Sequence, residues 1–165
     1  MADSTMTPAR LWKLMTADQR RRAAAALWRD PEAAADQAQA VVVVAKQRNF
    51  RPKTVMGFDD ERKASYLASV PNPPDTLAAR LLVLYHLAEQ RSMMGAFLDA
   101  LGIAHDDGLI QENTVVPDAA KVAAAAAALA RDYPARDVAL YLNTLLWQDQ
   151  VSWGVLQGLP EASLA

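Results

Sequence analysis

The chain has 165 residues, of which 52% are hydrophobic and 22% charged, as expected for a globular protein with a substantial core. Its net charge of −2 predicts no overall attraction to nucleic acid or to an anionic membrane, and the lack of cysteine excludes disulfides and thiolate chemistry. The N-terminus resembles no signal peptide, no apolar run could span a bilayer, and alanine is abundant, so we expect a bacterial, cytoplasmic protein.

The first 70 residues contain four stretches with helix-start signals. Residues 1–7 are small and polar and are expected to be disordered. Helices are then expected over residues 8–15, 16–29, 30–49 and 59–70. The second begins with a capping box at Thr16 and Gln19, and the third begins at Asp30 with Pro31 in its first turn. The third also contains four consecutive valines, which favour a strand, but its flanking residues favour a helix.

A proline-rich segment at 71–74 is the clearest interruption of the chain. Its three prolines predict a stiff, extended connector that divides residues 1–70 from residues 75–165. Because each part is small, we expect the two helical subdomains to share one core within a single domain.

Leu77–Leu101 is the most apolar part of the chain and is predicted to form two central helices, Thr76–Gln90 and Ser92–Leu101. Gly102 is expected to end the second helix in a left-handed conformation, with Ile103 folding back on its last turn. Beyond an irregular segment in which 114–116 could pair as a short strand, an alanine-rich helix is expected over residues 118–132.

The last predicted helix, Ala135–Leu156, has two apolar faces. Burial on two sides requires either a central position or contact with a second subunit. Asp149 lies on the other face, where it needs either a partner or a place at the rim. The face that we assign to a subunit interface carries Leu140, Trp147, Val151 and Val155.

The segment His105-Asp106-Asp107-Gly108 is the densest group of reactive side chains in the sequence. A calcium loop of the EF-hand type is excluded, because both end ligands are missing. A general acid–base unit of His105 with Asp106 or Asp107 is one hypothesis, and a simple turn is the other. A metal site is a weaker alternative, and it would use His86, Glu89 and His105.

A second group of candidates surrounds the single aromatic ring of Phe50. The cations are Lys46, Arg48, Arg51 and Lys53, and this pattern is typical of sites for anionic ligands. Nucleic acid is an unlikely ligand, because the chain as a whole lacks the basic excess of nucleic-acid-binding domains. A solvated loop with Phe50 in the core is the simpler interpretation.

Together these patterns predict an all-α fold, an irregular bundle of six to eight helices in a single domain. The leading functional hypothesis is a non-enzymatic interaction or structural protein without a cofactor, which binds itself as a homodimer or binds another protein. The alternative is a small metal-dependent or acid–base hydrolase that uses the His105–Gly108 loop.

Overall fold

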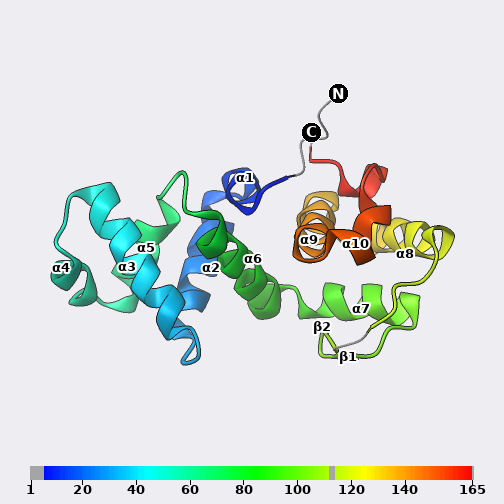
Figure 1. Ribbon diagram of the computed structural model, residues 1–165, viewed down its shortest axis with the longest axis horizontal. Coiled ribbons are helices and arrows are strands. Elements are labelled where there is room, and N and C mark those ends of the chain that lie inside the picture. Colours follow the sequence, from blue (N-terminus) through cyan, green and yellow to red (C-terminus); the bar gives the residue numbers. More distant parts are fainter. Residues whose placement is uncertain (1–5, 112–113, 165) are drawn as a thin grey trace. The chain divides into compact units, whose positions relative to one another are not determined.

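The computed structural model describes residues 6–111 and 114–164 (Figure 1). It is 72% helical, so the predicted all-α fold is confirmed. The described residues form ten α-helices, more than the six to eight expected. The excess arises because a short helix occupies the loop after Phe50, and because the predicted last helix is broken in two. No helix in the described parts of the chain is long and apolar enough to cross a bilayer.

The helices are grouped into two compact units, each of which is described by itself. The first unit is Thr7–Ala88, and the second consists of Met6 and the residues from Glu89 onward. The division therefore falls between the two central helices and not at the proline-rich segment, which lies inside the first unit. A core shared between residues 1–70 and 75–165 stays a prediction.

The first unit is built from six helices, and the first, second and fifth of them each begin at a capping side chain. At Thr16 the predicted capping box is confirmed, with the hydroxyl accepting from the Gln19 amide and the Gln19 side chain accepting from the Thr16 amide. Thr7 and Asp59 cap two further helices. The helices are α1 (Pro8–Leu14), α2 (Ala17–Arg29), α3 (Ala34–Arg48), α4 (Pro52–Met56), α5 (Asp60–Ala68) and α6 (Asp75–Glu89).

The core of this unit brings together segments distant in sequence. The indole Nε1 of Trp12 donates to the carbonyl oxygen of Val70 over 2.8 Å, which ties α1 to the chain just before the prolines. The carboxylate of Asp75 accepts from the amide of Ala9. Helices α2 and α5 pack closely because small alanine side chains face the contact. The fully buried leucines include Leu11, Leu27, Leu67, Leu77 and Leu81.

The second unit consists of helices and one short hairpin, which lies at its edge beside α7 (Figure 1). The ring of Phe97 lies edge-on to Tyr141, with centroids 5.8 Å apart, and near Trp153 at 6.0 Å. Gly102 has φ = 69°, and the amide of Ile103 donates to the carbonyl of Leu98, so the predicted helix ending is confirmed. The elements are α7 (Arg91–Leu101), β1 (His105–Asp106), β2 (Leu109–Ile110), α8 (Ala119–Asp132), α9 (Ala135–Gln148), α10 (Gln150–Trp153) and the 3₁₀ turns Gly154–Leu156 and Pro160–Ala162.

Three local predictions differ from the structure. The third helix begins at Ala34 and not at Pro31, because the Asp30 carboxylate accepts from the Glu32 amide in a turn instead of capping the helix. The strand expected at 114–116 does not form in the described part of that segment. The last helix ends at Gln148, because Asp149 adopts φ = −152° and ψ = 87° and starts a new helix as its cap.

Candidate functional site

His105 lies at the start of a hairpin that is held against α7. Strand β1 pairs with β2 in antiparallel register, His105 opposite Ile110. The connection is Asp107 and Gly108, with φ of 50° and 95°, the two positive values that a type I′ turn needs. An Asp-Gly pair is a strong hairpin signal, so the sequence did contain the information for this element. The catalytic candidates are therefore residues of a tight turn.

Both ring nitrogens of His105 are engaged within the hairpin and α7. Nε2 donates to the carboxylate of Asp99 over 2.7 Å, and Nδ1 accepts from the amide of Gly108 over 3.0 Å. A neutral imidazole has one donor and one acceptor nitrogen, and both are used here. Arg91 donates to the carbonyl of Asp107 and lies 3.5 Å from its carboxylate. In this arrangement no lone pair of His105 is left to take a proton from a substrate.

The residues of the alternative metal site lie in both units. His86 is buried in the first unit, and its Nδ1 lies 2.7 Å from the Leu82 carbonyl, which can only accept, so Nδ1 carries the proton. Burial lowers the pKa of His86 to about 4 and keeps the ring neutral. Glu89 and His105 belong to the second unit. No group of three His, Cys, Asp or Glu side chains suited to a metal occurs among the described residues.

The four predicted interface residues differ in exposure. Leu140 is buried, at 2% exposure. Trp147 and Val151 are 36% and 96% exposed, and Val155 is partly buried. Asp149, between them, is exposed, and its hydrogen bonds to Ser152 hold the pKa of its carboxyl below the usual value. The break at Asp149 means that these residues do not share one continuous helix.

The basic candidates of the first unit surround three aromatic rings and not one. Phe50 contacts Phe58 and Tyr66 edge-on, and Phe58 stacks with Tyr66 at a centroid distance of 5.4 Å. Two guanidinium groups lie over these rings: Arg62 is 4.3 Å from the centroid of Phe58, and Arg48 is 5.3 Å from that of Tyr66. We call Arg48, Phe50, Phe58, Arg62 and Tyr66 the arginine–aromatic cluster.

Arg62 was not among the sequence-based candidates for anion binding, although Phe58, Arg62 and Tyr66 are spaced at intervals of four, which is a helical signal. The rings are half-buried, whereas Lys46, Arg51, Lys53 and both arginines of the cluster are exposed. Across the described residues, no ion pair joins any of these five cations to a carboxylate. They therefore remain available to an external anion.

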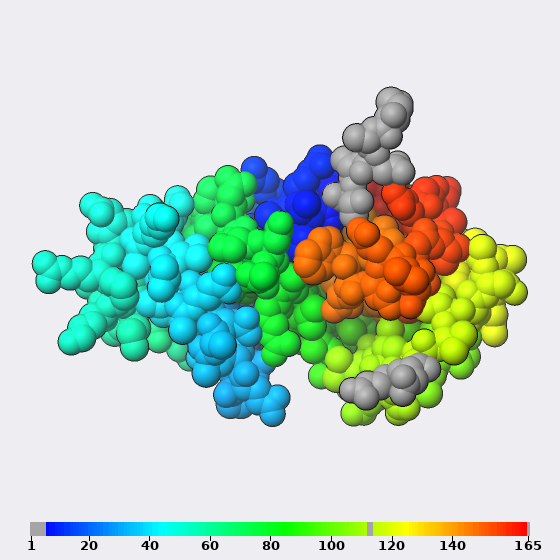
Figure 2. All heavy atoms as spheres, in the orientation of Figure 1, coloured from blue at the N-terminus to red at the C-terminus, as the bar shows by residue number. Residues whose placement is uncertain are grey.

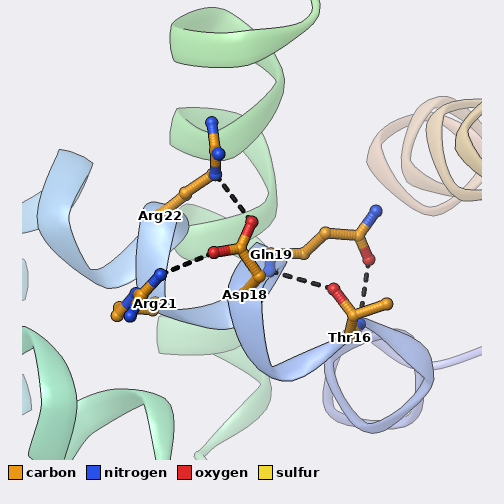
Figure 3. A network of polar contacts seen from close by, with 5 residues as sticks. All are labelled: Thr16, Asp18, Gln19, Arg21 and Arg22. Carbon is orange, nitrogen blue, oxygen red and sulfur yellow. Dashed lines mark hydrogen bonds and ion pairs between the residues drawn. The ribbon is translucent and has the colours of Figure 1, made fainter.

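In contrast to these cations, the arginines at the start of α2 have hydrogen-bonding partners within the first unit (Figure 3). Arg21 and Arg22 both donate to the carboxylate of Asp18, over 2.6 and 2.8 Å, and these bonds lower the pKa of Asp18. Arg20 donates to the carbonyl of Met15 at the end of α1. These three cations have partners inside the unit.

The charges of the chain are unevenly divided between the units. Thr7–Ala88 contains 13 Lys and Arg and 8 Asp and Glu, a net charge of +5. The residues from Glu89 onward contain 4 Lys and Arg and 10 Asp and Glu, a net charge of −6. The small net charge of the whole chain thus conceals a basic unit and an acidic one.

Comparisons of the chain with protein-family models, with curated proteins and with solved structures find no match.

Proposed function

We propose that the protein is a non-enzymatic helical interaction protein that self-associates, with the basic first unit of one copy contacting the acidic second unit of another. The observation that carries this proposal is the charge division, +5 in Thr7–Ala88 and −6 from Glu89 onward. Unlike charges on two surfaces steer their encounter and fix its orientation. In a two-fold dimer each unit meets its opposite once, so one contact type is used twice.

The arrangement of His105 favours this function over the alternative hydrolase. A general base needs a lone pair within reach of a substrate proton. The lone pair at Nδ1 accepts from Gly108, and the proton at Nε2 is donated to Asp99. These bonds support a structural role, in which the ring connects the hairpin to α7.

A second candidate contact is apolar and is supported by the exposure of Trp147 and Val151. Trp147 lies in the last turn of α9, just before the break, and Val151 lies in α10. Large exposed apolar side chains are common in protein contacts, and tryptophan is enriched among the residues that dominate binding energy. This contact would pair like surfaces of two copies.

The salt dependence of the oligomeric state tests the proposal. Between about 10 mM and about 1 M salt the electrostatic screening length falls from about 30 to about 3 Å. Size-exclusion chromatography with light scattering should detect a dimer in dilute salt that dissociates in concentrated salt. An association that persists in concentrated salt and is lost in Trp147→Asp would favour the apolar contact. A monomer at every salt concentration and at high protein concentration would refute self-association.

A further inference from the structure

We infer that the basic side of this contact is the arginine–aromatic cluster together with Lys46, Arg51 and Lys53, and that it binds carboxylates of a second copy's acidic unit. This inference rests on the proposed self-association and specifies the surface and the ligand groups. It assigns a binding role to one end of the first unit, formed by the end of α3, by α4 and by the start of α5.

The first argument is the concentration of unpaired cations in this region. Residues 37–58 contain four cations and no Asp or Glu. All four are exposed, and Arg62 joins them from α5 through its contact with Phe58. In Figure 2 the side chains of the segment around α4 extend outward at one end of the first unit. Asp59, Asp60 and Glu61 at the start of α5 are also exposed, but no ion pair in the described parts of the chain joins them to these cations, which can therefore attract an acidic surface.

The second argument is the preorganisation of two guanidinium groups. Arg48 donates to the hydroxyl of Ser69 over 2.9 Å and lies over Tyr66, and Arg62 lies over Phe58 with the Tyr66 ring centroid 5.7 Å away. A free arginine loses considerable side-chain entropy when it binds, whereas these are already positioned. A guanidinium has five N–H donors, so one bond to Ser69 leaves donors for a two-pronged carboxylate bond.

The third argument distinguishes carboxylates from a single-stranded nucleic acid. Proteins that hold single strands stack the bases on open aromatic faces. Here the Phe58 ring has Arg62 over one face and stacks with Tyr66, while Phe50 meets both rings edge-on. The rings are used as supports for arginines. The protein itself supplies a suitable acidic partner, its unit of net charge −6.

Charge-reversal variants of the full-length protein test the assignment. Arg48→Glu/Arg62→Glu removes the two positioned guanidinium groups, and Lys46→Glu/Lys53→Glu makes the same charge change without touching the ring contacts. The matched control is Arg10→Glu/Lys13→Glu, two exposed cations of α1. Sedimentation velocity in dilute salt measures the dissociation constant of self-association. This constant should rise about tenfold or more in both cluster variants, a typical effect of lost charge complementarity, and should change much less in the control.

A mixing experiment tests the polarity of the contact. Asp106→Lys/Asp132→Lys reverses two exposed acidic residues of the second unit. This variant and Arg48→Glu/Arg62→Glu should each associate weakly alone, but their mixture should form heteromers, because each contributes one intact surface. A mixture as monomeric as its components would overturn the inference.

The remaining outcomes separate this inference from the proposed function. If wild-type protein does not self-associate, the proposed function fails and the inference fails with it. If all three basic-unit variants weaken association equally, the attraction follows net charge alone, so the inference fails and the proposed function stands. Fluorescence anisotropy with a labelled polyglutamate peptide and a labelled single-stranded DNA compares the two ligand classes. Tighter binding of the DNA, abolished by Arg48→Glu/Arg62→Glu, would overturn the assignment to carboxylates.

Discussion

Two buried tryptophans of the first unit provide a test of how much a single hydrogen bond contributes to stability. Trp12 is fully buried, and its indole N–H donates to Val70 over 2.8 Å. Trp28 is also buried, but its Nε1 has no hydrogen-bond partner among the described residues. Changing each to phenylalanine removes a similar amount of ring surface and the same N–H group, and it keeps an aromatic ring beneath the Lys63 ammonium that lies 5.2 Å from the Trp28 ring. The main difference between the two variants is therefore the hydrogen bond.

Loss of the indole N–H is expected to lower the free energy of unfolding in Trp12→Phe and to raise it in Trp28→Phe. The smaller ring costs about 1 kcal/mol at either position. Trp12→Phe additionally leaves a buried carbonyl without its donor, for a total of about 2–4 kcal/mol. Trp28→Phe instead removes a buried donor that lost its water on folding, which offsets most of the packing cost and leaves a change within about 1 kcal/mol of zero.

Urea unfolding followed by circular dichroism measures both variants. With a slope of about 2 kcal/mol per molar urea, the two midpoints should differ by about 0.5 M or more. Equal losses for Trp12→Phe and Trp28→Phe would refute the reasoning, because the cost would then follow ring volume and not hydrogen bonding.

Three further predictions concern the hairpin, the buried histidine and the cap of α10. Gly108→Ala should destabilise the second unit by about 2 kcal/mol in thermal unfolding, because a Cβ at this position meets Met94 at 3.0 Å and the backbone φ is positive. The control Gly95→Ala, inside α7, should be neutral or stabilising by up to about 1 kcal/mol. His86 is neutral in the folded protein, with a pKa of about 4, and takes up its proton on unfolding, so stability should fall as the pH falls from about 6.5 to 4, by up to about 3 kcal/mol. His86→Gln should flatten this dependence in urea unfolding at pH 7 and pH 4.5, and an unchanged slope would contradict it. The carboxyl of Asp149 has a lowered pKa and caps α10, so the protection of the Ser152 amide from hydrogen exchange, relative to an unstructured amide at the same pH, should fall as acid protonates this carboxyl. This acid dependence should be lost in Asp149→Asn, which retains a capping oxygen.

Local helix signals were the most predictable features of this chain. The capping box at Thr16 and the left-handed Gly102 depend only on neighbouring residues, and both were located correctly. The apolar stripe of Leu77, Leu81 and Leu84 is buried as its spacing predicts. The sequence did not reveal that α6 and α7 belong to different compact units, because that division depends on contacts between distant segments.

The break in the last helix shows where periodicity fails. No proline or glycine separates Gln148 from Gln150, so the apolar pattern continues through a residue whose backbone leaves the helix. The only local signal for the break was the tendency of aspartate to cap a helix. Because the apolar pattern continues on both sides of Asp149, the sequence fits an unbroken helix equally well. Of the two alternatives for Asp149, a partnered carboxylate on the apolar face or a place at the rim, the structure agrees with the second, because Asp149 is an exposed cap.

The candidate site was only partly predictable. The cations from Lys46 to Lys53 were found, but their aromatic supports come from α5, and Arg62 reaches them only through the fold. The net charge of the whole chain also concealed the division, because its value of −2 is the sum of +5 in Thr7–Ala88, −6 from Glu89 onward and −1 from Asp3. The opposite charges of the two units are evident only once the chain is divided at their boundary, which depends on contacts between distant segments.

The unequal charge of the two units has a consequence for handling the protein in solution. Near the isoelectric point of the sequence, about 5.6, the whole chain is neutral while both units remain charged. Precipitation there would arise from attraction between unlike regions of different molecules, and added salt would dissolve the precipitate before higher concentrations bring it back. A salting-in regime is thus expected, and a buffer of very low ionic strength is the condition least suited to keeping the protein in solution.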